Sequence, residues 1–176
     1  GEAKKSKIKI QNLVQFDLRE GSLINGVITS EDGLKHQLEK AWESHGISKK
    51  ISLVIDSTQI AAKLMTIPKM NKKKTLETVR KELSSIENPE KYVYDYRVCG
   101  MDKKSGMATV LGAAVQESML KSYLDVFAAM GVEVESVDIA LNAQLKAFDR
   151  IQSLKNETFI FSKLDAEILI STLFVQ

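Results

Sequence analysis

The residues that most often carry catalysis are few in this chain, and their spacing does not suit it. His36 and His45 are the two histidines, and both fall in a stretch with the apolar spacing of one helix. Nine residues correspond to two and a half helical turns, so the imidazoles point to different faces. This spacing supports neither a shared metal ion nor a histidine paired with a nucleophile. We interpret both as surface or helix-end residues.

Cysteine and carboxylate chemistry is equally limited. Cys99 is the single cysteine, which excludes an internal disulfide and a cluster of thiolate metal ligands. No histidine or basic cluster neighbours it, so we interpret it as a small apolar residue of a strand. Asp95 and Asp138 lie in or beside apolar strands, where a carboxylate needs a partner. For both we favour local hydrogen bonding at a strand edge or end over catalysis.

Motifs for phosphate and nucleic acid are also missing. The nine glycines are scattered and form neither Gly-x-x-x-x-Gly-Lys-Ser/Thr nor Gly-x-Gly-x-x-Gly. Lys72, Lys73 and Lys74 form a basic run, but no aromatic residue lies beside it for base stacking. Glu77 and Glu82 follow on the same amphipathic helix, so we interpret the run as a solvated helix face. The sequence predicts no nucleic-acid partner.

Composition is that of a folded globular protein. The chain has 176 residues, of which 44% are apolar and 27% charged, and a net charge of +2. This balance gives no general attraction to nucleic acid or anionic lipid. No apolar run reaches the roughly 20 residues that span a bilayer, and residues 1–7 lack the apolar centre of a signal peptide. We expect a cytoplasmic fragment without direct membrane insertion.

Apolar periodicity divides the chain into strands and helices. Thr29 or Ser30 is expected to cap the first helix, and Gly46 to end it. The predicted helices cover residues 31–45, 75–86, 117–130 and 140–154. The predicted strands cover residues 8–18, 27–28, 51–55, 59–67, 92–98, 107–115, 132–139, 158–164 and 167–175. A polar hairpin loop is predicted for residues 100–106.

The middle of the chain has the element order strand, helix, strand, strand, helix, strand. This order over residues 57–138 predicts a split βαβ unit, with four strands and two helices on one face. Tyr92, Tyr94 and Tyr96 point to one side of their strand, and we expect them to pack beneath the two helices.

Several short motifs, in the same order, resemble PilM-type pilus assembly proteins. The resemblance covers nearly the whole chain from about Ser22. Its motifs are Ile67-Pro68-Lys69-Met70, Glu82, Pro89, Asp95, Leu111 to Glu117, Ala129 to Leu141, and the early stretch from Gly26 to Trp42.

This resemblance implies an α/β fold that is part of an actin-like (ribonuclease H-like) fold with an inserted split-βαβ (βαββαβ) subdomain, as in the division protein FtsA. It places residues 1–56 in the first actin-like subdomain and residues 57–138 in the insert. Residues 139–157 form the return helix of the first subdomain. Residues 158–176 begin the second half, which is truncated.

The function implied by the resemblance is that of a non-catalytic cytoplasmic scaffold or adaptor. It would serve a type IV pilus or type II secretion-like assembly platform and bind the cytoplasmic tail of a PilN-like inner-membrane protein. The chain would then lie at the inner face of the cell membrane through its partners. Whether it forms a homo-oligomer stays open, as do an FtsA-like role in cell division and a fragment of an actin-fold kinase or ATPase.

The junction between the insert and the first subdomain is the expected partner site. The chain crosses it twice, so two strand ends and the return helix meet there in a concave place suited to an extended peptide. The same side chains could instead seal the core between the subdomains. The candidate partner-binding residues are Ser57, Thr58, Asp138, Leu141, Asn142 and Leu145.

Proteins of this type bind a nucleotide between their halves, but the sequence departs from their phosphate loops. The first loop would precede residue 1, and the second would fall within residues 161–165. There Ser162 takes the place of an aspartate and Leu164 that of a glycine, which alone permits close backbone approach to phosphate. We expect no ATP hydrolysis, cofactor or metal here, while ATP binding by a full-length parent stays open.

Overall fold

Two apolar cores organise the described residues of the computed structural model, which are residue 10 and residues 12–154, 157–165 and 168–175. The helices are α1 (Glu31–His45), α2 (Lys72–Glu82), α3 (Glu117–Ala129) and α4 (Ala140–Phe148), with the 3-10 turns η1 (Pro89–Lys91) and η2 (Gln152–Leu154). The strands are β1 (Leu23–Ile24), β2 (Val27–Ile28), β3 (Lys50–Ile55), β4 (Ala61–Pro68), β5 (Tyr92–Asp102), β6 (Met107–Gln116), β7 (Glu133–Ile139), β8 (Phe159–Asp165) and β9 (Ile168–Phe174). Parallel and antiparallel pairs both occur, so the fold is α/β, as expected.

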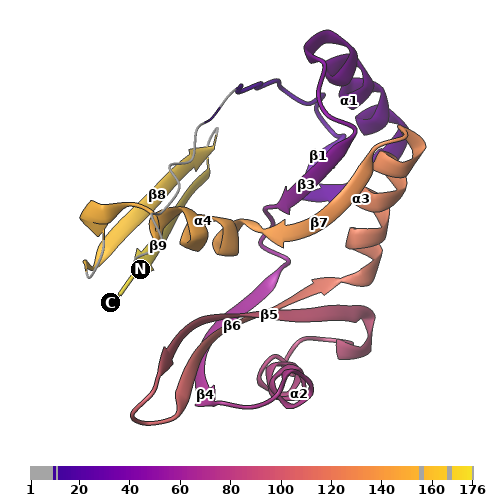
Figure 1. Cartoon of the computed structure of the whole chain (residues 1–176). Coiled ribbons are helices and arrows are strands. Elements are labelled where there is room, and N and C mark those ends of the chain that lie inside the picture. Colours follow the sequence, from indigo (N-terminus) through magenta and orange to yellow (C-terminus); the bar gives the residue numbers. More distant parts are fainter. Residues whose placement is uncertain (1–9, 11, 155–156, 166–167, 176) are drawn as a thin grey trace.

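The first core lies between α1, α3 and the parallel pair β3–β7 (Figure 1). Ser30 caps α1 by accepting a hydrogen bond from the Gly33 backbone N–H (3.2 Å), and Gly46 ends the helix in the left-handed region, both as predicted. Trp42 of α1 packs against Phe127 of α3 with 5.9 Å between ring centroids. The two helices are thereby held together above the sheet.

The second core lies between α2 and an antiparallel sheet of order β4-β6-β5 (Figure 1). Val79 of α2 is fully buried, and a Cβ atom at Gly112 of β6 would stand 2.7 Å from its Cγ1. The helix therefore rests directly on the strand at this glycine. Tyr94 is buried in this core, with Tyr92 and Tyr96 partly buried beside it. The tyrosines pack beneath α2 as predicted, but not beneath α3, which lies in the first core.

The expected sheet of four strands within residues 57–138 is not formed. The element order is present, but β7 pairs in parallel with β3 in the first core, and α3 packs there against α1. The sheet of the second core thus has three strands and one covering helix. The apolar side chains of α3 and β7 are buried against α1 and β3, which local periodicity cannot reveal. The division of the chain into domains stays a prediction.

The predicted strand near the start is also wrong where the structure describes it. Residues 12–19 have no regular structure, and the Leu13 side chain is 83% exposed. Residues 8, 9 and 11 of that prediction lie outside the described residues. Period-two spacing alone does not make a strand, since backbone N–H and C=O groups need a neighbouring strand to pair with.

Two element boundaries moved for identifiable local reasons. Helix α2 begins at Lys72 because the Asn71 side chain accepts a hydrogen bond from the Lys74 backbone N–H (3.0 Å). Strand β5 continues to Asp102, which leaves a hairpin loop of residues 103–106 in place of 100–106. Asp102 caps this loop by accepting from the Lys104 backbone N–H (2.8 Å) and the Ser105 hydroxyl (2.7 Å).

Helix α4 ends at Phe148, before the predicted residue 154, and packs on the β8–β9 hairpin. The Phe148 ring meets Phe159, Phe161 and Phe174 edge-on, with ring centroids 5.0 to 5.2 Å apart. The hairpin also reaches the end of β3, where the Lys163 ammonium lies 2.8 Å from the Asp56 carboxylate. The first contact holds the hairpin against α4, and the second holds it against the end of β3.

Candidate functional site

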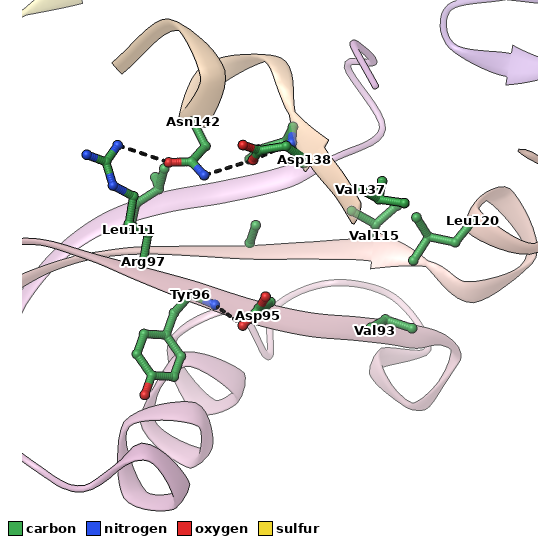
Figure 2. Close-up of a pocket in the computed structure, with 12 residues that line it drawn as sticks. Val93, Asp95, Tyr96, Arg97, Leu111, Val115, Leu120, Val137, Asp138 and Asn142 are labelled. Atoms are coloured by element: carbon green, nitrogen blue, oxygen red, sulfur yellow. Dashed lines mark hydrogen bonds between the residues drawn. The ribbon is translucent and has the colours of Figure 1, made fainter. Parts of the chain in front are cut away.

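A groove lies where the β5–β6 face opposite α2 meets β7 and the start of α4 (Figure 2). Its volume is about 270 Å³. Most of its lining is apolar, with a few polar side chains concentrated toward α4. The lining residues are Val93, Asp95, Tyr96, Arg97, Leu111, Ala113, Val115, Leu120, Val137, Asp138, Ile139 and Asn142.

The alternation of strand side chains decides which residues of β5 reach the groove. The tyrosines point toward α2, so the intervening Val93, Asp95 and Arg97 take the opposite face. Leu111, which is buried, stands opposite Arg97 on β6. One face of the sheet therefore supplies a core and the other supplies the floor of the groove.

A continuous polar network closes one end of the groove. Asp138, at the end of β7, accepts hydrogen bonds from the Ile139 backbone N–H (2.8 Å), Asn142 Nδ2 (2.8 Å) and Lys146 Nζ (2.6 Å). Asn142 Oδ1 in turn accepts from Arg97 Nη1 (3.2 Å). Arg97 Nη2 also donates to Asp149 Oδ2 (2.8 Å). The network thus joins β5 of the antiparallel sheet to α4.

The electrostatics of this network favour an ionised Asp138. Burial raises the pKa of its carboxyl. The hydrogen bonds from Lys146, Asn142 and the Ile139 backbone together lower the pKa by more than burial raises it, so the net pKa lies below the ordinary 3.8. The expectation that Asp138 is satisfied locally at a strand end is confirmed. Asp95 likewise accepts a local hydrogen bond from the Tyr96 backbone N–H (2.8 Å).

The structure brings only two of the six predicted partner-binding residues together. Asp138 and Asn142 line the groove side by side, and Leu145 is half-buried on the same helix. Leu141 lines a different pocket, which it shares with Phe161 of β8. Sequence reasoning missed the floor of the groove, although the period-two pattern of β5 contained the signal.

Ser57 and Thr58 line a separate cavity, and Thr58 holds the turn between β1 and β2. Thr58 Oγ1 accepts from Asn25 Nδ2 (2.6 Å), and the Thr58 backbone N–H donates to Asn25 Oδ1 (3.1 Å). Asn25 and Gly26 both have positive φ, and a Cβ atom at Gly26 would stand 2.3 Å from the Asp56 carbonyl oxygen. Thr58 therefore fastens the segment between β3 and β4 to the turn between β1 and β2.

The remaining candidates for chemistry lie apart from one another. His36, His45 and the lysine run are exposed, and the described residues contain no group of three or more histidine, cysteine, aspartate or glutamate side chains placed to hold a metal ion. Cys99 is exposed, which corrects its interpretation as a packed apolar residue. The strand register shifts between Val98 and Gly100, so Cys99 has no opposite residue on β6.

Comparison with known proteins identifies the fold. No protein-family model and no curated protein match the chain, but 16 chains of solved structures do. One of them belongs to a structure described as "PilM-PilN type IV pilus biogenesis complex", with a TM-score of 0.76 and 18% sequence identity. The match covers 88% of this chain and 48% of that chain. The present chain has the fold of about half of its counterpart in that complex.

No described helix is both long and apolar enough to cross a membrane. This finding concerns only the described part of the chain. It agrees with the sequence, in which no apolar run reaches that length.

The Asp138 network predicts a pH-dependent contribution to stability. A lowered pKa in the folded state stabilises the protein above the unfolded value of 3.8, and this stabilisation is lost as the pH falls through the lower folded value. We expect Asp138→Asn to cost about 1 kcal/mol near pH 7 and progressively less as the pH falls below 3.8. Urea unfolding over this range measures the difference. Asp17→Asn, at an exposed position, is the control, and a loss that is constant with pH would contradict this account.

Proposed function

We propose that this chain is a non-catalytic adaptor of a type IV pilus assembly platform, and that its groove binds an extended segment from the cytoplasmic tail of a PilN-type membrane protein. The observation that carries the proposal is the fold similarity, at a TM-score of 0.76, to a chain from a PilM-PilN complex. The groove supplies the physical means. In this proposal the chain is part of an actin-like protein and acts in the cytoplasm, at the membrane, through its partner.

The groove has the properties that a bound peptide requires. Apolar side chains of β5, β6, β7 and α3 line it, while Arg97, Asp138 and Asn142 supply donors and acceptors at one end. Strand β5 is an edge of its sheet within the described residues, so one side of its backbone is open to pairing. An extended peptide needs partners for its own N–H and C=O groups, and an open strand edge offers them.

We also propose that this chain neither binds a nucleotide nor catalyses a reaction. Ser162 and Leu164, at the expected second phosphate loop, lie in regular antiparallel pairing with Ser171 and Leu169 of β9. The Ser162 hydroxyl lies 2.8 Å from that of Ser171. Between them Lys163 is paired with Asp56. A strand in this arrangement offers phosphate no glycine turn with free N–H groups.

Isothermal titration with Mg-ATP tests the proposed lack of nucleotide binding. We expect no heat of binding at micromolar or millimolar nucleotide, because the phosphate contacts are replaced by strand pairing and an ion pair. Titration with Mg-ADP serves as a second probe, and an unrelated ATPase confirms the quality of the nucleotide. Saturable binding in the micromolar range would contradict this part of the proposal.

A peptide-binding measurement tests the groove itself. The probe is a labelled peptide of the cytoplasmic tail of the PilN-type protein from the same organism, followed by fluorescence anisotropy. Asn142→Arg places a second cation beside Arg97 and removes the amide oxygen that accepts from Arg97 Nη1, so we expect at least tenfold weaker binding, the equivalent of about 1.4 kcal/mol. Circular dichroism checks that the variant remains folded.

The matched control changes charge on the other face of the sheet. Charge reversal of Lys72, Lys73 and Lys74 on α2 should leave tail binding within about twofold, because α2 covers the face opposite the groove. If this triple variant loses binding while Asn142→Arg retains it, the groove is not the partner site.

A further inference from the structure

The groove contains one acidic side chain whose charge has no cationic partner. Asp95 accepts a hydrogen bond from the Tyr96 backbone N–H (2.8 Å), and no cation pairs with it among the described residues. The neighbouring charges are already balanced, since Arg97 pairs with Asp149 (2.8 Å) and Asp138 with Lys146 (2.6 Å). A ligand in the groove therefore meets one uncompensated negative charge.

The edge of β5 beside Asp95 faces no other described strand, although the adjacent Tyr96 backbone N–H is held by the Asp95 carboxylate. Strand β5 pairs only with β6 among the described strands, so the N–H and C=O groups of its other edge have no strand partner. Exposed strand edges of this kind readily accept an added strand. Val93 lies two residues before Asp95 and is 45% exposed, which leaves apolar area available on the same face.

If a ligand strand pairs with this edge, its register determines which of its side chains contacts each side chain of the groove. Residues directly opposite each other on neighbouring strands place their Cβ atoms about 5 Å apart, on the same face. Val93 and Asp95 share the groove face because they are two positions apart (Figure 2). A ligand strand would therefore contact them with two of its residues that are separated by one residue.

We propose that the groove takes an extended segment that pairs with the free edge of β5, carries a lysine or arginine opposite Asp95 and an apolar residue opposite Val93. This inference rests on the proposed function, because it specifies which peptide the groove selects. A cytoplasmic tail suits it in charge, since the cytoplasmic flanks of membrane-spanning helices carry an excess of lysine and arginine. The specificity element is thus an apolar and a basic residue with one residue between them.

The test uses the same labelled PilN-type tail peptide and versions of it. Both versions change the basic residue that lies two positions from an apolar residue. One version has norleucine at this position, and the other has glutamate. Asp95→Asn should weaken binding of the natural tail about tenfold, the size expected for a hydrogen bond between charged groups, and should leave the norleucine tail unchanged. Glu77→Gln is the control, because it makes the same charge change on α2 at the opposite face.

A charge exchange makes the test independent of any general loss of affinity. Asp95→Lys should weaken the natural tail and recover binding of the glutamate version to within about threefold of the original pair. Because Asp95 is exposed, these variants should stay folded, as circular dichroism will show.

The outcomes separate this inference from the proposed function. Equal losses for the natural and norleucine tails, or no loss with Asp95→Asn, would overturn the role of Asp95 while tail binding by the wild-type chain stands. Failure of the wild-type chain to bind any tail version would overturn both, and it would be seen before any variant is made.

Discussion

The parallel pairing of β3 with β7 is the constraint on which the remaining arrangement depends. Residues 50–55 pair with residues 133–139, so the chain must leave the first core after Ile55 and return beside the same strand. The intervening chain forms the antiparallel sheet and α2, then re-enters through α3. Since β7 lies beside β3 and α4 follows it at once, the end of β7 faces the antiparallel sheet. The groove forms because β7 returns beside β3 and brings α4 to the antiparallel sheet.

Two kinds of contact keep the antiparallel sheet in place relative to the first core. On one side Thr58, between β3 and β4, exchanges two hydrogen bonds with Asn25. On the other, Arg97 reaches Asn142 and Asp149 across the end of the groove. These contacts are polar and partly exposed, while each core is apolar inside. The groove therefore has a polar end beside a mostly apolar floor, the arrangement that the proposed peptide ligand requires.

Helices and strands were predicted well where a cap or a strand alternation marks them in the sequence. The caps at Ser30 and Gly46 and the alternation around Tyr94 set boundaries and faces that the structure confirms. Pairing between distant segments was not predictable in this way. Nothing in the pattern of β7 distinguishes a fourth strand of the insert from a partner of β3, because both positions bury the same apolar side chains. The strand expected near Leu13 failed for a related reason, since no described strand lies beside it to accept its hydrogen bonds.

The candidate site was also predicted in part. Residues with a local sequence signal were found, and residues whose role depends on contacts between distant segments were missed. Asp138 and Asn142 were found because they stand where a strand ends and a helix begins, which is visible in the sequence. Ser57 and Thr58 lie in the other crossing of the chain, but the fold uses Thr58 to fasten a turn. The alternation of β5 places Val93 and Arg97 on the face away from the tyrosines, but it does not show what that face meets. They were missed because β7 and α4 reach this face only through the pairing of β7 with the distant strand β3.

The most direct test of the peptide-binding groove is a chemical-shift map of the ¹⁵N-labelled chain titrated with the tail peptide of the PilN-type protein. The account predicts that backbone amides of β5, of β7 and of the first turn of α4 shift together with a single saturable affinity. Amides of α2, on the opposite face of the antiparallel sheet, should stay in place. Shifts confined to α2 or to the β8–β9 hairpin, with the groove amides unchanged at saturation, would contradict it.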